Sequence, residues 1–162
     1  MKDLLDKLSS YNLFNYLLPG ILFAVLSKRF THFSVIQDSL VLGVFIYYFI
    51  GLVISRVGSL VIEPVLKKIS FLKFAEYGDF VAASKSDAKI ELLSETNNMY
   101  RTLLSMLVSL LLLKGYEVMA MKYQIPDEVG GGTLTLLLLI MFLFSYRKQT
   151  DYVRKRVGAA KE

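Results

Sequence analysis

The chain has 162 residues, of which 54% are hydrophobic and 20% are charged, and its formal net charge is +5. It has no cysteine and one histidine, His32, which excludes disulfides, thiol catalysis, iron–sulfur clusters and zinc sites built from cysteine or histidine. Four apolar segments, near 13–26, 39–55, 98–114 and 129–146, carry few or no charges. With flanking turns each approaches the roughly 20 residues that cross a bilayer, which predicts an all-α, polytopic membrane protein with four transmembrane helices.

Residues 1–12, which precede the first span, are predicted to form a short amphipathic helix in the membrane interface. In the first span, Pro19 lacks a backbone donor and predicts a kink between Asn15 and Pro19. An asparagine is unfavourable against lipid, so Asn15 is expected to face another helix. We favour a packing contact there over the alternative, a contact for a ligand or an ion.

The second span, 39–55, contains a stripe of small residues. Gly43, Gly51 and Gly58 are spaced at seven or eight residues, so one stripe of the helix is nearly free of side chains. These glycines are predicted to allow close helix packing. Because the residue before a proline disfavours helix, Pro64 predicts the end of this helix.

Residues 65–97 form the one sizeable hydrophilic segment. Aromatic residues at mostly three-residue steps from Phe71 to Phe80 predict a first helix, and Ser86 is the expected N-cap of a second helix that leads into the third span. About 30 residues are too few for an independent catalytic domain. The segment therefore predicts a short cytoplasmic helical hairpin between transmembrane helices 2 and 3.

The third and fourth spans are joined by a predicted loop over 114–128 with a charge near zero. Gly130–Gly132 is either a flexible link or the start of the fourth helix. A strongly basic tail follows the fourth span. These features divide the chain into an amphipathic helix with transmembrane helices 1 and 2 (1–64), a cytoplasmic helical segment (65–97), transmembrane helices 3 and 4 (98–146) and a basic cytoplasmic tail (147–162).

With four spans, both termini and the loop between spans two and three lie on one side of the membrane. Only four basic residues would lie on the other side: Lys28, Arg29, Lys114 and Lys122. Because Lys and Arg accumulate in cytoplasmic loops, both termini and this loop are predicted to be cytoplasmic in a bacterial inner membrane. Topology and contact with anionic membrane lipids also account for the pI of about 9.3, so no direct nucleic-acid binding is expected.

Charged residues at the cytoplasmic ends of spans two and three are candidates for an ion pair or a gate. Arg56 ends span two, and a charge at that depth should be paired or reach the interface. Glu63 lies two turns farther on the same helix face and is the nearest predicted partner of Arg56. Glu91 or Glu95 can reach Arg56 from the second cytoplasmic helix. Arg101 opens span three among polar residues. The alternatives are an interface anchor at Arg56, and either helix packing or a polar pore vestibule at Arg101.

The basic tail supplies candidate contacts to lipid or to a protein partner. Its cations are Arg147, Lys148, Arg154, Lys155 and Arg156, with Lys161 beyond them. We favour a helix lying on anionic lipid over a helix that docks a cytoplasmic protein.

Three stretches carry a family resemblance: YNLFNYLLPGILF (Tyr11–Phe23), FIGLVISRVGSLVIEP (Phe49–Pro64) and LSETNNMYR (Leu93–Arg101). They resemble small four-span bacterial membrane proteins, such as the membrane subunits of Kiwa-type antiphage defence systems. The resemblance implies an inner-membrane protein that forms a homo-oligomer, works with a cytoplasmic protein partner, and senses or permeabilises a disturbed membrane. It supplies no active-site residue.

No sequence motif for nucleotide, zinc or acyl-transfer chemistry is found, so a non-enzymatic protein without catalytic residues, metal or cofactor is expected. We therefore expect a membrane sensor or membrane-perturbing effector subunit in antiphage defence. Two alternatives stay open. One is a small transporter or channel, which is weakened because no acidic residue lies inside the predicted spans. The other is a holin-like pore-forming toxin.

Overall fold

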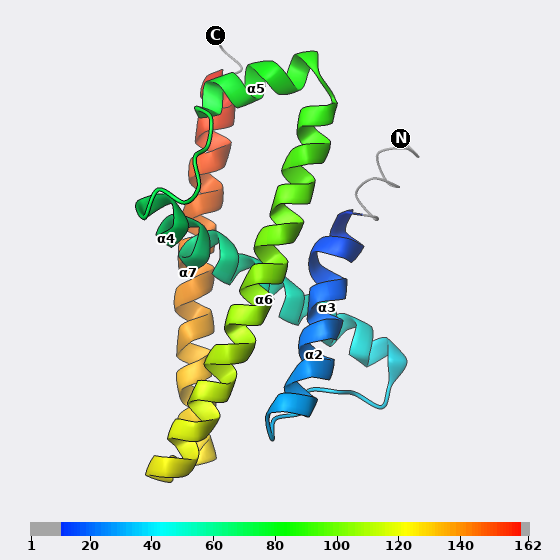
Figure 1. Cartoon of the computed structure of the whole chain (residues 1–162), viewed down its shortest axis with the longest axis vertical. Helices are drawn as coiled ribbons and strands as arrows, with labels where there is room; N and C mark the ends of the chain where they lie inside the picture. Colours follow the sequence, from blue (N-terminus) through cyan, green and yellow to red (C-terminus); the bar gives the residue numbers. More distant parts are fainter. Residues whose placement is uncertain (1–10, 160–162) are drawn as a thin grey trace.

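The computed structural model describes residues 11–159, so the amphipathic helix predicted at 1–12 lies almost wholly outside the described residues. Within them every regular element is helical, which confirms the all-α class. In chain order the elements are η1 (Leu13–Leu17), α2 (Leu18–Phe30), α3 (Leu40–Val57), η2 (Gly58–Ile62), α4 (Glu63–Lys68), α5 (Tyr77–Ser86), α6 (Lys89–Tyr123) and α7 (Asp127–Ala159) (Figure 1). The elements η1 and η2 are π-helical turns.

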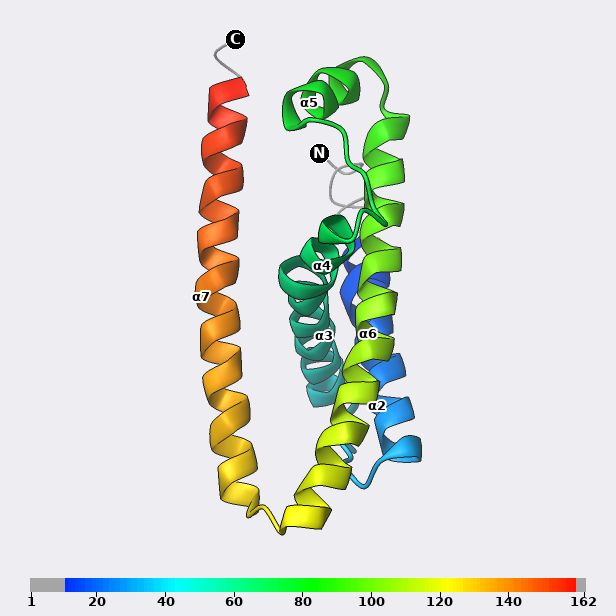
Figure 2. The same cartoon turned by 60° about the vertical axis from the view of Figure 1, so that its left-hand side comes forward.

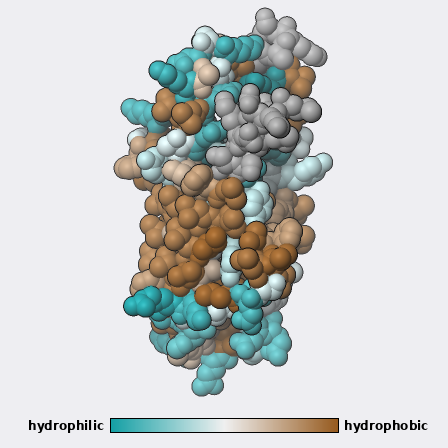
Figure 3. Space-filling view, turned by 90° about the vertical axis from the view of Figure 1, so that its right-hand side faces the viewer, coloured by the Kyte–Doolittle hydropathy of each residue, from teal (hydrophilic) through white to brown (hydrophobic). Residues whose placement is uncertain are grey.

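Four continuous helices are long and apolar enough to cross a membrane: Leu13–Phe30, Leu40–Lys68, Lys89–Tyr123 and Asp127–Gly158. They coincide with the four predicted spans. The second begins after Ser39, the N-cap of α3, whose hydroxyl accepts the Leu42 N–H (3.4 Å). The face of the molecule in Figure 3 carries a hydrophobic belt between two more hydrophilic ends. This pattern fits a multi-pass membrane protein.

The helices α6 and α7 are much longer than a bilayer is thick. At 1.5 Å per residue their 35 and 33 residues span about 50 Å, against about 30 Å of hydrocarbon. Both project toward the end of the molecule that carries α5 (Figure 2). The basic tail through Arg156 belongs to this projection, so it continues the fourth helix and is not a separate helix lying on lipid.

The prediction of a loop over 114–128 is wrong, because both of its ends are helical. α6 continues to Tyr123, where the left-handed conformation of Gln124 (φ 51°) ends it, and α7 begins at Asp127. The stretch after Lys114 stays helical because it contains no proline and many good helix formers, among them Met, Ala, Glu and Lys. Gly130–Gly132 therefore lies in the first turns of α7.

Each of the two helices with an internal proline has a π-helical turn just before it. η1 precedes Pro19 and η2 precedes Pro64, and each proline occupies the first turn of the following α-helical segment. The helix predicted to end near Pro64 therefore continues to Lys68, and that prediction is wrong. The π turn changes the hydrogen-bond register ahead of the ring, so the helix tolerates a residue with no N–H.

After α4 the chain reverses and then runs without helix to α5. Ser70 has a left-handed backbone (φ 59°), and the Phe71 N–H donates to the Leu66 carbonyl (3.0 Å), which closes the turn. The Lys67 ammonium lies 3.9 Å from the centre of the Phe74 ring and holds the following segment against α4. The helix predicted to begin near Phe71 is therefore wrong as far as Glu76. Over 71–76 these tertiary contacts override the helical spacing of the aromatic residues.

The hydrophilic segment contains the helix α5 and the first turns of α6. The predicted cap is displaced: Ser86 ends α5, and the Asp87 carboxylate accepts the Lys89 N–H (2.9 Å) at the start of α6. α5 lies across the end of the molecule between α6 and α7 (Figures 1 and 2). The ring of Tyr77 there lies 6.4 Å from that of Tyr152 on α7.

Three helical units pack together, and α7 stands apart from them (Figure 2). The closest approach joins η1–α2 to α3. A Cβ atom on Gly51 would lie 1.8 Å from the carbonyl oxygen of Tyr16, and one on Gly20 would lie 1.8 Å from that of Tyr47. Only glycine lets these two backbones touch, so the two residues fix the contact between the first two spans.

Candidate functional site

A buried polar core joins the three packed helical units. Asn15 on η1, Ser55 on α3 and Thr102 on α6 are 1%, 2% and 0% exposed. The Thr102 hydroxyl lies 3.0 Å from the Asn15 Oδ1, 3.3 Å from the Ser55 Oγ and 2.9 Å from the Asn98 carbonyl oxygen. Burial raises the pKa of the nearby Tyr11 hydroxyl. Asn15, predicted to face another helix, makes its contact here.

The three glycines of the predicted stripe have different surroundings. Gly51 contacts the first span, and a Cβ on Gly58 would lie 2.4 Å from the Ser105 Oγ on α6. A Cβ on Gly43 would lie 3.2 Å from the ring of Tyr47 on its own helix, and the three atoms nearest to it all belong to Tyr47. Pro19 is buried beside the same first contact. Gly51 and Gly58 are therefore enclosed within one chain.

A charged cluster lies at the end of this core nearest α5. The Arg101 Nη1–H donates to the Glu63 Oε2 (2.8 Å), and the Lys67 ammonium lies 3.1 Å from the Glu63 Oε1. The Lys148 ammonium of α7 approaches the same Oε1 to 3.9 Å. Glu63 is 8% exposed, so its carboxylate depends on these cations in place of water. One carboxylate thus joins α4, α6 and α7.

Lys148 also fastens α7 to the backbone of the second helix. Its ammonium donates to the carbonyl oxygen (2.6 Å) and to the hydroxyl (2.8 Å) of Ser59 in η2. Farther along α7, the ring of Phe142 stacks 6.2 Å from that of Phe49. The wide π turn of η2 contains the carbonyl that Lys148 reaches, so the helix irregularity and the docking of α7 coincide.

The other two residues of the predicted ion pair are not in this cluster. Arg56 is half-buried, and it makes no ion pair with any residue between 11 and 159; the partner of Glu63 is Arg101. Glu95 is also half-buried and is outside the ion pairs of the described chain. A shared helix face does not bring Arg56 and Glu63 into an ion pair, because the π turn between them rotates Glu63 toward α6.

Lys148 differs from the other cations that the sequence assigned to the tail. Arg147, Lys155 and Arg156 are exposed, and the exposed Arg154 pairs with Asp151 on its own helix (3.3 Å). Only Lys148 of this group reaches another helix. The sequence carries only a partial signal: Lys148, Arg101 and Glu63 all lie close to the end of an apolar run and so at a similar depth, but Arg147 lies there too.

Glu117 is a buried residue that the sequence reading missed. It is 3% exposed, and its carboxylate accepts the backbone N–H of His32 and pairs with Lys114 one turn earlier. It thereby holds the α2–α3 connection against α6. Glu63 and Glu117 lie outside the predicted spans 39–55 and 98–114, but the longer helices Leu40–Lys68 and Lys89–Tyr123 include both buried carboxylates.

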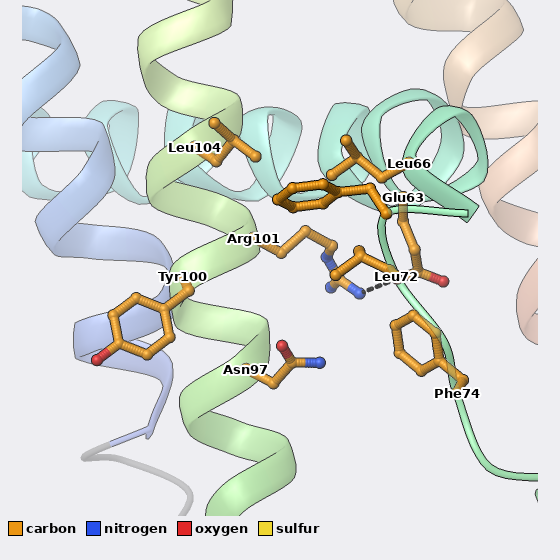
Figure 4. Close-up of a pocket in the computed structure, with 9 residues that line it drawn as sticks. Glu63, Leu66, Leu72, Phe74, Asn97, Tyr100, Arg101 and Leu104 are labelled. Carbon is orange, nitrogen blue, oxygen red and sulfur yellow. Dashed lines mark hydrogen bonds and ion pairs between the residues drawn. The ribbon is translucent and has the colours of Figure 1, made fainter. Parts of the chain in front are cut away.

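A small cavity of about 130 Å³ opens beside the Arg101–Glu63 pair (Figure 4). Its walls are mostly apolar and include Leu66, Leu72 and Phe74 on one side and Leu104 of α6 on the other. The Arg101 side chain extends from α6 toward Glu63 and the segment after α4. The cavity therefore combines a guanidinium with apolar walls.

Comparisons with protein-family models, with curated proteins and with solved structures give no match for this chain. The resemblance to membrane subunits of antiphage defence systems stays a prediction.

Proposed function

We propose that the chain is a non-enzymatic, multi-pass subunit of the bacterial inner membrane that acts as a sensor or membrane-perturbing effector in antiphage defence. In this proposal it forms a homo-oligomer and works with a cytoplasmic protein partner. The observation that carries the proposal is the weak attachment of α7. Its main contacts are with α3 and η2, and its polar attachment there is Lys148.

The exposure of α7 supports a second copy of the chain as its neighbour. No residue in its apolar window is buried, against 28%, 22% and 22% of the windows in the other three spans. Gly51 and Gly58 are enclosed within one chain, so they are not free to join two copies. We therefore place the homo-oligomer contact on α7, where close packing of helices in lipid gains van der Waals contact.

A movement of α7 would reach the end of the molecule where a partner can bind. Tyr152 of α7 contacts Tyr77 at the start of α5, and the exposed cations Arg154–Arg156 lie farther along the same helix. The excess of Lys and Arg at this end places it in the cytoplasm in our proposal. A membrane disturbance that undocks α7 would then change the surface formed by α5 and the basic tail.

Oxidative crosslinking tests the oligomer, because a chain without cysteine gives signals only from introduced residues. Three single-cysteine variants are compared in native membranes: Leu137→Cys on α7 (58% exposed), Leu111→Cys on α6 (73% exposed) and Ala24→Cys on α2 (1% exposed). We expect disulfide-linked dimers from the α7 variant only. Equal dimer yields from α6 and α7 would mean random collision and would remove the oligomer contact from α7.

Membrane potential tests the sensor or effector activity itself. A potential-sensitive dye is followed in bacteria that express the full chain, before and after phage infection. We expect a stable potential before infection and a depolarisation that depends on the chain after it. Depolarisation on expression alone, without phage or partner, would instead support the holin-like toxin.

The small transporter is the second candidate, because Glu63 now provides a buried carboxylate in a spanning helix. Three cations surround that carboxylate, which favours a fixed ion pair over a proton carrier. Proton-coupled flux in liposomes that is lost in Glu63→Gln would favour the transporter over the sensor.

A further inference from the structure

The charged cluster around Glu63 has more positive than negative charge. Arg101, Lys67 and Lys148 all lie within 4.0 Å of this one carboxylate. The Arg101 Nε is buried, and no other residue between 11 and 159 accepts a hydrogen bond from it. Excess cationic charge and an unused guanidinium donor both favour an additional anion at this place.

The cavity beside Arg101 suits the junction of an anionic group and a hydrocarbon chain. The Arg101 side chain extends into it between Leu104 on one side and Leu72 and the ring of Phe74 on the other (Figure 4). A water-soluble anion would gain nothing from such walls. An amphiphile would place its charged group on Arg101 and its chain on the apolar wall.

The segment from Lys67 to Phe74 has the composition of a chain that lies in the surface of an anionic membrane. It contains the cations Lys67, Lys68 and Lys73 and no acidic residue. Between them, Ile69 and Phe71 are 64% and 73% exposed, although both are large and apolar. Lysines attract anionic headgroups while apolar side chains enter the acyl region.

We propose that this cavity binds the headgroup phosphate of an anionic phospholipid from the leaflet at this end of the molecule. The phosphate contacts the Arg101 guanidinium, which can donate two parallel hydrogen bonds to it. One acyl chain follows Phe71 and Leu104 toward the hydrophobic belt. The inference goes beyond the proposed function, because lipid selectivity at this site does not depend on a protein partner, on a second copy of the chain or on phage.

Tryptophan fluorescence tests the proposal, because the chain has no tryptophan of its own. Phe71→Trp places a reporter beside the cavity, and Phe45→Trp places one on the exposed middle of α3 (71% exposed). The full chain is reconstituted in vesicles that contain brominated phosphatidylglycerol or brominated phosphatidylcholine. At the first reporter we expect quenching to show an affinity about fivefold higher for the anionic lipid than for phosphatidylcholine. This is the factor that one added cation contributes at a membrane surface. At the second reporter we expect no preference.

Two substitutions break the same ion pair and are expected to act in opposite directions. In the F71W background, Arg101→Gln removes the phosphate donor and lowers the preference for phosphatidylglycerol to near that of F45W. Glu63→Gln removes the competing carboxylate and raises the preference. Lys67→Gln changes an exposed side chain and should also lower the preference, so it tests the site even if the Arg101 variant does not fold. Arg154→Gln on α7 is the matched control and should have no effect.

Three outcomes would overturn the proposal. Equal preference at the two reporters would mean general attraction to the membrane surface. A change of the same direction in R101Q and E63Q would mean that the ion pair only supports the fold. Displacement of the brominated lipid by inorganic phosphate would mean that the site binds a free anion and does not need the acyl chain.

Discussion

The first three helical units and α7 are held in place by different physics. η1–α2, α3 and α6 touch through glycines and share buried hydroxyl and amide groups, such as Asn15 and Thr102. α7 is a long helix with a leucine-rich apolar part, and it contacts the others through Lys148 and one aromatic stack. In lipid, apolar surface alone gives little drive for helix association, so close backbone contact and polar groups decide which helices stay together. The comparison indicates a fixed three-helix unit and one helix with freedom to move.

Gly51→Ala should have the largest effect, because it attacks the contact on which the fixed unit depends. The added Cβ would overlap the backbone oxygen of Tyr16, which no side-chain rotation can relieve. We expect a loss of roughly 3 kcal/mol or more in the free energy of unfolding, measured by circular dichroism in mixed micelles. Gly131→Ala on α7 meets no atom within 4 Å and should be neutral or stabilising. Similar losses at both sites would contradict the division between the two regions.

Gly58→Ala should have a smaller effect that a second substitution can relieve. Here the added Cβ would meet the Ser105 Oγ, the end of a side chain, and we expect a loss of about 1.5 kcal/mol in the same unfolding measurement. The double variant G58A/S105A removes the overlapping oxygen and should recover much of the loss. If the double variant is no more stable than G58A, the nearby Arg101 backbone and not Ser105 sets the distance between α6 and η2.

Thr102→Val removes one hydroxyl from the polar core and keeps the shape of the side chain. The Asn15 amide and the Ser55 hydroxyl then lose a partner while both stay buried, so we expect a loss of about 1 kcal/mol in the free energy of unfolding. Thr135→Val is the matched control, since the Thr135 hydroxyl is exposed and bonds only to Gly131 of its own helix (2.9 Å). Equal effects at the two threonines would mean that the core bonds add nothing specific.

The spans follow from residue order alone, because the need to bury backbone polar groups in lipid makes long apolar runs helical. Their ends do not follow from it. Local rules predict that the second helix ends near Pro64, but with a π turn before the proline the helix continues past it. Residues 114–123 likewise stay helical after the apolar run has ended. Sequence patterns report on a residue and its neighbours in the chain, whereas the helix ends here depend on side-chain contacts with other helices.

The candidate site was partly predictable for the same reason. Glu63 and Arg101 were identified because charges at the ends of spans need partners, but the pairing between them depends on how the helices rotate against each other. Lys148 was assigned to a tail because it stands in a run of cations, and nothing in that run distinguishes the one ammonium that reaches Ser59. The spacing of Lys114 and Glu117 shows their pairing on one helix, but the contact of Glu117 with another segment is to a backbone N–H, which has no sequence signature.

Lys148→Gln should have the smallest effect on unfolding and the most specific effect on position. It removes the ammonium that α7 extends to Ser59 and Glu63, while Gly51 and Thr102 stay untouched. We expect the docking of α7 to weaken by about 0.6 kcal/mol, or roughly threefold in its equilibrium constant, the average for one polar contact between helices in lipid. The unfolding of the three-helix unit should not change measurably.

Crosslinking measures this docking directly. Cysteines introduced as Phe49→Cys and Phe142→Cys replace the stacked rings, and a short bifunctional reagent joins them only while α7 is docked. The rate of crosslinking should fall in the K148Q background and stay the same with Lys155→Gln, which removes an exposed cation two turns along the same helix. An unchanged rate with K148Q would show that apolar packing alone holds α7, and the distinction between a fixed unit and a movable helix would then lose its physical basis.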